Sequence, residues 1–369
     1  MIDLSRMKTV RVDPAHHVAQ ADPGLLLAEF DHETQAFGMA TTLGTFSVTG
    51  ISGLTLGGGL GWLMGKHGLA CDNLISVDVV TADGELLRAN TEENSDLFWG
   101  LRGGSGNFGV ATRLEFQLHP VGPLFAGLVA FPISQAADVL RFYLDYSATA
   151  PDELGLMAAL ITLPDGNTVV GVEGCYNGPV EKGERVLHPL RSFGPPAIDL
   201  FQMMPYTAVQ KMNDWWAIPG QQHYWKSGFL RELNDAAIHT IAEFAMRKPS
   251  LGSAVALEFI HGAARRIAPD ATAFAHRDAQ YNFLMLGRWE SPAETETGMR
   301  WVREFWSAMQ PFLSAGVYVN YLSENEGGDR VRSAYGMNYE RLVQVKAKYD
   351  PTNFFCMNHN IRTANAAAL

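Results

Sequence analysis

The sequence predicts an α+β protein that is divided into two domains. The chain has 369 residues, which is long enough to bury a sizeable core and suggests two domains. Apolar runs of strand length, several of them paired across short turns, alternate with amphipathic segments of helical period. This order indicates an antiparallel sheet covered by helices. Residues 119–123 contain two prolines and a glycine, and they predict the boundary between the domains.

Composition and charge exclude several classes of function. Hydrophobic residues make up 47% of the chain and charged residues 18%, which is typical of a globular protein. The net charge of −11 disfavours nucleic acid as a partner, because phosphate binding needs a basic surface. No apolar stretch approaches the roughly 18 uninterrupted residues that a membrane-spanning helix needs, so no membrane span is predicted.

The cysteines and the first residues give expectations about compartment. Cys71, Cys175 and Cys356 are too few and too scattered for a disulfide framework or a metal cluster, so we expect buried, reduced thiols and no metal. The chain starts with neither the basic segment nor the apolar run of a signal peptide, and a cytoplasmic protein is therefore expected. The oligomeric state does not follow from the sequence.

The N-terminal part predicts two short strands and one helix. Residues 2–7 and 10–14 have the character of strands. Residues 25–37 carry apolar side chains on one helical face, and Gly38 fits the position just past the end of a helix.

Two glycine clusters within residues 49–118 frame a predicted hairpin. Apolar runs at 74–81 and 85–88 are joined across Asp83-Gly84, which is a strong short-range signal for a hairpin. The clusters, at 57–61 and 103–109, suggest turns that present backbone N–H groups to an anionic ligand. The alternative is that the glycines only make tight turns. The pattern is not a Walker loop, and it is a poor dinucleotide fingerprint.

The second domain is predicted as strands with intervening helices. A strand at 124–131 is followed by a helix with Ser134 as the expected N-cap, and then by a hairpin of strands 154–163 and 168–176. A helix is predicted at 181–192. The stretch 194–228 is rich in Trp, Tyr, Met and Pro, which is consistent with an apolar pocket wall or with ordinary packing.

The remaining elements complete this pattern. Strands are predicted at 253–261, 280–289 and 317–322. Ser291 opens a helix with a capping box, and a last helix around 339–349 ends before an Asp-Pro pair.

Several long motifs carry a resemblance to a known family. They read GGGLGWLMGKHGLACDNLISVDVVTADGELL, DLFWGLRGGSGNFGV, YWKSGFL, HRDAQY, YVNYLSENEG and YGMNYERLVQVKAKYDPTNFFCMNHNI. In this order they resemble the berberine bridge enzyme-like FAD-linked oxidases of the vanillyl-alcohol oxidase superfamily. The resemblance covers nearly the whole chain. It implies an FAD-binding domain of that type and an α+β substrate domain.

The resemblance also implies domain limits. Residues 1–118 correspond to the second half of the FAD-binding domain, and residues 119–315 to the substrate domain. Residues 316–369 correspond to the segment that returns to the FAD-binding domain. Relatives carry an upstream segment that forms the first half of the flavin domain, with a pyrophosphate loop and often a histidine bonded to the flavin. The expectation is that this half is lacking here.

By resemblance, one set of residues is expected to contact FAD. These are Thr49, Gly50, Gly57, Gly58, Gly59, Gly61, Gly68, Asp72, Asn73, Gly104, Gly109, Val110, Asn358 and Asn360. Gly50 stands where some relatives have a cysteine bonded to the flavin, so any FAD is expected to be non-covalent. Relatives usually carry an arginine where Gly65 stands and an aromatic residue where His67 stands.

Three residues are candidates for catalysis. In the family's Y-x-N-Y pattern the last tyrosine is often the base, and here it is Tyr321. Glu258 is a charge within an apolar run, and strand alternation puts it on the face opposite its apolar neighbours, which is either a pocket or solvent. Asn282 falls near a position where relatives can hold an acidic residue, and an amide there can only orient substrate. His261 and His276 are weaker candidates.

The resemblance therefore implies an FAD-dependent oxidoreductase that acts on a small or medium-sized organic molecule. A sugar, an alkaloid and a polyketide-type metabolite all stay open as substrates. The alternative is a flavin-free descendant that uses the substrate domain for binding or for a non-redox reaction.

Overall fold

The computed structural model describes residues 2–163, 165–230, 233–323 and 326–363. The strands are β1 (Val10–Asp13), β2 (Val18–Ala21), β3 (Met39–Ala40), β4 (Leu74–Val80), β5 (Leu86–Asn90), β6 (Val110–Gln117), β7 (His119–Pro120), β8 (Leu124–Pro132), β9 (Leu154–Thr162), β10 (Thr168–Tyr176), β11 (Ile198–Asp199), β12 (Gln202–Met204), β13 (Gln222–Leu230), β14 (Ala254–Phe259) and β15 (Tyr281–Trp289). The α-helices are α1 (Leu27–Gln35), α2 (Ile51–Leu56), α3 (Met64–His67), α4 (Ser95–Leu101), α5 (Ala136–Ser147), α6 (Val180–Arg191), α7 (Tyr206–Val209), α8 (Asp235–Met246), α9 (Ala263–Arg266), α10 (Thr295–Met309), α11 (Gly328–Tyr335) and α12 (Tyr339–Tyr349).

The smaller sheet is built from the N-terminal part of the chain. Its strand order is β1-β2-β6-β4-β5, and each neighbouring pair is antiparallel. The hairpin predicted across Asp83-Gly84 is confirmed by β4 and β5, because Val80 pairs with Leu86. Gly84 has a φ of +82°, a conformation that glycine adopts without strain.

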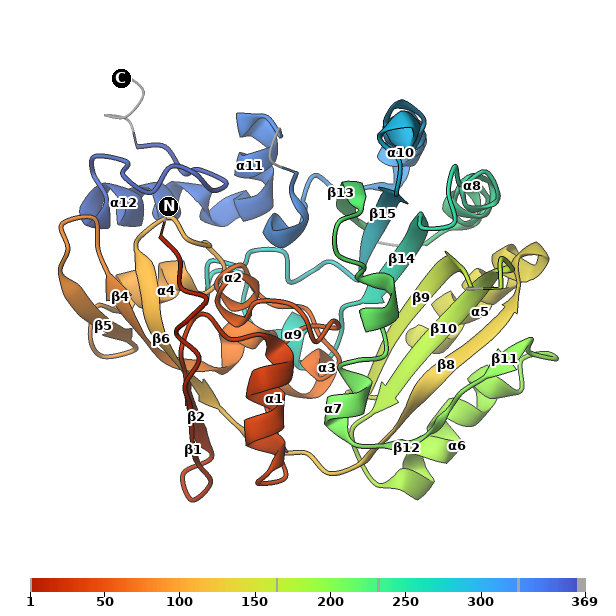
Figure 1. The fold of residues 1–369 in the computed structure, drawn as a ribbon, viewed down its shortest axis with the longest axis horizontal. Helices are drawn as coiled ribbons and strands as arrows, with labels where there is room; N and C mark the ends of the chain where they lie inside the picture. The colour runs from red at the N-terminus through yellow and green to blue at the C-terminus, as the bar shows by residue number, and fades with distance from the viewer. Residues whose placement is uncertain (1, 164, 231–232, 324–325, 364–369) are drawn as a thin grey trace.

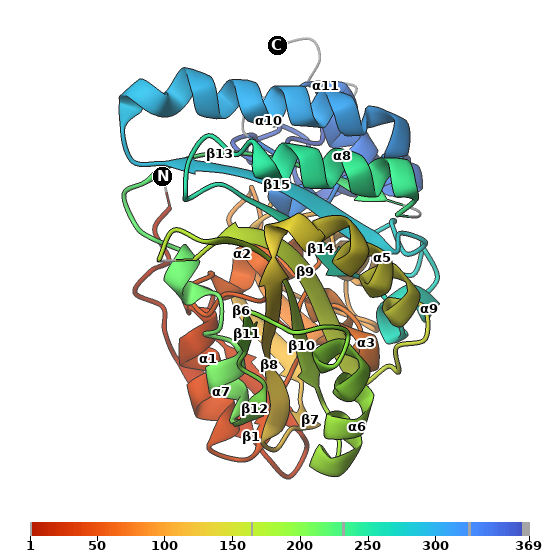
Figure 2. The same cartoon turned by 90° about the vertical axis from the view of Figure 1, so that its right-hand side faces the viewer.

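The larger sheet has the order β11-β8-β10-β9-β14-β15-β13, with β12 also paired to β8. Every pair in it is antiparallel, and α5, α6, α8 and α10 cover one face (Figures 1 and 2). The short helix α7 lies on the other face, against β8 and α1 (Figure 1). The predicted α+β class is therefore confirmed.

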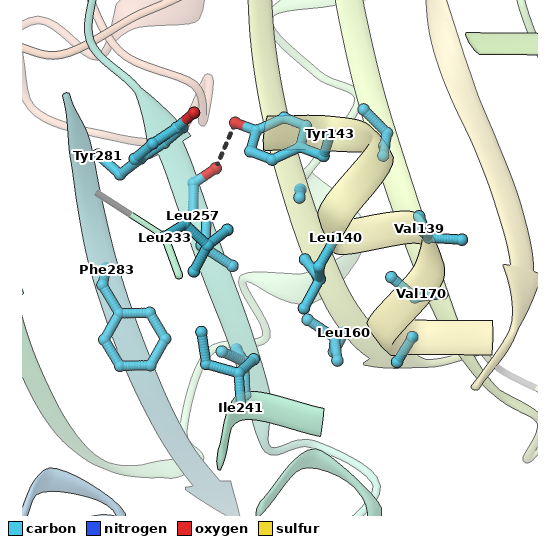
Figure 3. Close-up of a cluster of buried hydrophobic side chains, with 14 of the residues drawn as sticks. Val139, Leu140, Tyr143, Leu160, Val170, Leu233, Ile241, Leu257, Tyr281 and Phe283 are labelled. Atoms are coloured by element: carbon cyan, nitrogen blue, oxygen red, sulfur yellow. Dashed lines mark hydrogen bonds between the residues drawn. The ribbon is translucent and has the colours of Figure 1, made fainter. Parts of the chain in front are cut away.

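A large apolar core lies between the larger sheet and its covering helices. Leu140 and Tyr143 of α5 are fully buried there, facing Leu257 and Phe283 of the sheet (Figure 3). The hydroxyl of Tyr143 donates a hydrogen bond of 3.1 Å to the carbonyl of Leu257, which satisfies the one polar atom of that side chain. The apolar face of α5 is thus the one that packs on the sheet.

The C-terminal segment shares its core with the smaller sheet. Leu342 and Val345 of α12 lie in one buried cluster with Phe108 and Leu114. α12 packs against α4, which is far from it in sequence, and lies at the same end of the molecule as the smaller sheet (Figure 1). A buried ion pair, Lys346–Asp350, reinforces this packing, because the ammonium also donates to the carbonyls of Asn107 and Phe355.

Some local predictions are wrong. Residues 2–7 form no strand, since only Ser5 and Arg6 are in a turn and the others are irregular. Ser134 lies inside a 3₁₀ turn, Ile133–Gln135, that precedes α5 instead of capping it. Cys71 and Cys175 are buried as expected, but Cys356 is exposed. Pro164 of the predicted turn lies outside the described residues. No helix in the described ranges combines the length and apolar character that crossing a bilayer requires.

Candidate active site

A cavity of about 970 Å³ lies between the inner face of the larger sheet and the glycine-rich part of the chain. Its sheet wall comes from β9, β10, β13, β14 and β15. Its opposite wall comes from residues 44–54 and 318–321, and residues 213–219, Leu60 and His359 complete it. Most of this wall is apolar. No lysine or arginine is among the described residues that line it.

The three predicted catalytic residues lie together in or beside this cavity. The hydroxyl of Tyr321 donates to Oε1 of Glu258 at 3.1 Å, and Nδ2 of Asn282 donates to Oε2 of the same carboxylate at 2.5 Å. Glu258 and Asn282 are cross-strand partners on β14 and β15. Tyr321 and Glu258 line the cavity, whereas Asn282 is fully buried behind the carboxylate. Glu258 is only 5% exposed, so its face of the strand is a pocket and not solvent.

Burial changes the acid–base properties of this pair. Desolvation raises the pKa of Glu258 to about 7, although the hydrogen bonds from Asn282 and Tyr321 act in the opposite direction. The pKa of Tyr321 is raised well above its ordinary value, first by burial and then by the adjacent carboxylate. The carboxylate is therefore the group of the pair that accepts a proton near neutral pH.

The segment that carries Tyr321 is a turn, so the predicted strand at 317–322 is wrong. Val319–Tyr321 is a 3₁₀ turn, in which side chains three residues apart lie on one side. The rings of Tyr318 and Tyr321 accordingly meet edge to face, with centroids 5.0 Å apart. This geometry turns Tyr321 toward Glu258.

Tertiary contacts hold this turn against the glycine-rich segment. The amide of Gly59 donates to the Tyr318 hydroxyl at 2.7 Å, and Asn320 donates to the carbonyl of Leu54 at 3.0 Å. Gly57 permits the second contact, because a Cβ there would lie 1.9 Å from Oδ1 of Asn320. The Y-V-N-Y motif thus uses its first tyrosine and its asparagine for attachment and its last tyrosine for the cavity.

Four amides of the two glycine clusters are already donated within the chain. The amides of Gly57, Gly58 and Gly104 donate to carbonyls within the chain, and the amide of Gly59 donates to a tyrosine. In this conformation these four amides therefore already have a partner within the chain. A Cβ at Gly59 would lie 2.3 Å from that of Ala70, so the alternative of close packing explains this glycine.

Other predicted cofactor residues also make structural contacts. Gly68 donates its amide to a carbonyl in α3, and the carboxylate of Asp72 forms a buried ion pair with Arg277 at 2.7 Å. The side chain of Asn73 bonds two carbonyls and the His119 ring.

Four further predicted cofactor residues also have structural roles, and these are Gly61, Gly109, Val110 and Asn358. A Cβ at Gly61 or Gly109 would lie within 2.5 Å of a neighbouring atom, and Val110 begins β6. Asn358 donates to the carbonyl of Gly106, whereas Oδ1 of Asn360 is buried without a partner among the described residues.

Thr49 and Gly50 are the predicted cofactor residues that line the cavity. A Cβ added to Gly50, or to Gly53 one turn later in α2, would meet nothing within 4 Å. The backbone here borders open space, so a flat ring can lie against it. An apolar cavity with accessible backbone on one wall and a Tyr–Glu pair on the other fits an isoalloxazine ring and a substrate together.

Two weaker candidates from the sequence lie outside the cavity, and one residue that lines the cavity was not predicted. His261 and His276 are not among the cavity-lining residues, and His276 bonds carbonyls of α11. The aromatic stretch 194–228 does reach the cavity through Trp216 and its neighbours. Glu173 lines the cavity and was missed, although it is a charge within an apolar run in the same way as Glu258.

Comparisons with known proteins identify the family. The profile of the FAD binding domain matches residues 1–90, and that of the berberine and berberine-like domain matches residues 317–362. An FAD-linked oxidoreductase of Dictyostelium discoideum is 30% identical over 364 residues, which cover 98% of this chain and 79% of that protein. The chain belongs to the berberine bridge enzyme-like FAD-linked oxidoreductases. It is an enzyme of that family, and FAD is its cofactor.

Other members of the family extend the comparison. (R)-6-hydroxynicotine oxidase of Paenarthrobacter nicotinovorans is 30% identical over 378 residues, 98% of this chain and 81% of that one. The crystal structure of 6-hydroxy-D-nicotine oxidase from Arthrobacter nicotinovorans has a TM-score of 0.87 at 28% identity, covering 98% of this chain and 82% of that one. A chitooligosaccharide oxidase has a TM-score of 0.85 at 25% identity, with coverage of 98% and 81%. This berberine bridge enzyme-like protein thus resembles oxidases named for an alkaloid and for a sugar.

Proposed function

We propose that this cavity oxidises a small or medium-sized organic substrate, with the Tyr321–Glu258 pair removing a proton. The observation that carries the proposal is the hydrogen bond from the Tyr321 hydroxyl to a buried carboxylate that lines an apolar cavity. Oxidation of an alcohol or amine separates a hydride from a proton, and FAD, when bound, supplies the hydride acceptor. Sugar, alkaloid and polyketide-type substrates all fit this chemistry.

The roles within the pair follow from their positions. A substrate O–H or N–H next to Tyr321 passes its proton to the phenol oxygen while the phenol's own proton passes to Glu258. This relay avoids a free phenolate, which burial and the adjacent carboxylate both disfavour. Asn282 holds the carboxylate in place through its 2.5 Å hydrogen bond. The Tyr321 assigned as base from the sequence therefore acts together with the carboxylate.

Tyr321→Phe tests the role of the hydroxyl. We expect turnover to fall by roughly 10²–10⁴, the usual range for losing a general base, with little loss of thermal stability. The measurement is anaerobic reduction of the flavin absorbance band by a panel of alcohols, sugars and cyclic amines. A Tyr321→Phe protein that reduces its flavin at the normal rate would remove Tyr321 from the mechanism.

We further propose that FAD is bound without a covalent bond, since Gly50 provides no thiol where the resemblance places a cysteine. Denaturation in acid should then release all flavin into the supernatant. Yellow protein in the precipitate would contradict this proposal.

Substitutions at two open glycines test whether the cavity holds the ring. Gly53→Phe places a ring in the cavity, and the chain offers Gly122→Phe as a matched control, because a Cβ there also meets nothing within 4 Å. FAD titration should give saturable binding to the native protein and to the control, and none to Gly53→Phe. Unchanged FAD binding in Gly53→Phe would show that the ring does not lie in this cavity.

A further inference from the structure

A second buried carboxylate shares the cavity with Glu258. Glu173 on β10 is the cross-strand partner of Met157 on β9, and Met157 is in turn the partner of Glu258 on β14. Cross-strand partners point to the same face of a sheet. The two carboxylates therefore point into one cavity from positions two strands apart, which separates their backbones by about 9–10 Å.

Glu173 has little inside the protein to balance its charge. It is 6% exposed, and Oε2 accepts a hydrogen bond of 3.1 Å from Asn213. Among the described residues, no hydrogen bond reaches Oε1 and no ion pair includes this carboxylate. Its pKa is raised to about 7 by burial, with the Asn213 hydrogen bond acting in the opposite direction and no cation contributing.

An aromatic wall on the Tyr321 side of the same cavity also suits a cation, because Trp225 lies against Tyr321. Trp216 and Trp225 line the cavity with ring centroids 6.0 Å apart, and Trp215, 44% exposed, lines it too. The faces of indole rings attract cations, most strongly where water is excluded. Arg288 lies over Trp216 but is not among the cavity-lining residues.

We propose that Glu173 is a binding residue for a cationic nitrogen of the substrate, held at a distance from the oxidised carbon beside Tyr321 and Glu258. This inference rests on the proposed function. It narrows the substrate class to amines in which a short chain separates the cationic nitrogen from an aromatic or alicyclic ring. An uncompensated carboxylate opposes substrates with carboxylate or phosphate groups. An oligosaccharide would leave most of its hydroxyls facing apolar side chains, without partners.

Three probes of similar shape and different charge test the proposal on the FAD-loaded protein. They are 4-phenylbutylamine, 4-phenylbutanol and 4-phenylbutyrate, and the measurement is titration calorimetry at pH 8. We expect the amine to bind about ten- to a hundredfold more tightly than the alcohol, the range for a hydrogen bond to a charged group. The carboxylate should bind more weakly than the alcohol.

Glu173→Gln keeps the shape of the side chain and an acceptor for Asn213, so the fold is preserved. We expect it to remove the preference for the amine and to leave the affinity for the alcohol and the flavin content unchanged. Glu153→Gln, at a half-buried carboxylate outside the cavity that pairs with Lys182, is the matched control and should keep the preference. Equal binding of amine and alcohol to the native protein, or equal loss of all three probes in Glu173→Gln, would overturn the proposal.

The proposed redox function and the proposed amine site can be contradicted independently of each other. If the amine preference is present but no amine, alcohol or sugar reduces the flavin, the oxidation proposal is wrong while the amine site stands. If the flavin is reduced by an uncharged substrate and the amine preference is absent, the oxidation proposal stands and the assignment of Glu173 is wrong.

Discussion

The proton relay predicts how the rate of flavin reduction depends on pH. With the pKa of Glu258 at about 7, the carboxylate is half ionised at pH 7 and about 1% ionised at pH 5. If this carboxylate accepts the proton, the rate rises with pH through this window and levels off above about pH 8. Between pH 7 and pH 5 the rate should fall about fiftyfold.

Tyr321→Phe should move the rise in the rate of flavin reduction to higher pH. The tyrosine hydrogen bond favours the ionised carboxylate and so lowers the pKa of Glu258. A hydrogen bond to a charged group contributes about 1.5–3 kcal/mol, and 1.36 kcal/mol corresponds to one pKa unit. The midpoint should therefore rise by about one unit or more, in addition to the loss of rate on the plateau.

The assay is stopped-flow flavin reduction at limiting substrate between pH 5 and pH 9.5. Glu258→Gln should abolish the dependence on pH in this range along with most of the rate, and Asn282→Leu should shift the midpoint upward as Tyr321→Phe does. An unchanged acid limb in Glu258→Gln, or a downward shift in Tyr321→Phe, would refute the assignment of Glu258 as proton acceptor.

Three further predictions concern stability. Burial raises the pKa of Asp31 to about 8 from 3.8, so the unfolded state holds fewer protons between these values and stability falls as pH rises through them. Asp31→Asn should therefore raise the melting temperature at pH 8.5 and change it little at pH 4. Lys346→Met leaves Asp350 buried without its partner and should lower the free energy of unfolding in urea by about 3–5 kcal/mol, whereas Lys348→Met, at an exposed ion pair, should change it by about 0–1 kcal/mol. Gly59→Ala brings two methyl groups within 2.3 Å at a φ of +85° and should prevent soluble expression; a normal yield would show that the turn is not this tight.

The sequence by itself determined the class of the fold and most of its elements. Hairpins such as β4–β5 and β9–β10 depend on neighbouring residues, because turn chemistry and the period of the apolar pattern are local properties. The capping box at Ser291 is present for the same reason. The charge within the apolar run around Glu258 marked a position that is buried in the site, and the same pattern was present at Glu173.

Only the tertiary structure decided what the glycines and the Y-V-N-Y motif do. Alternation in residues 317–322 fits a strand, yet contacts to Leu54 and Gly59 hold a 3₁₀ turn instead. The amides of Gly57, Gly58 and Gly104 close local turns, whereas the amide of Gly59 donates to the hydroxyl of Tyr318, a partner that no spacing in the sequence reveals. The carboxylates of Glu173 and Glu258 are 85 residues apart in the chain and share a cavity because three strands align in register. A site built from long-range register and burial is a property of the folded chain, since neither its geometry nor its raised pKa values exist before the strands pair.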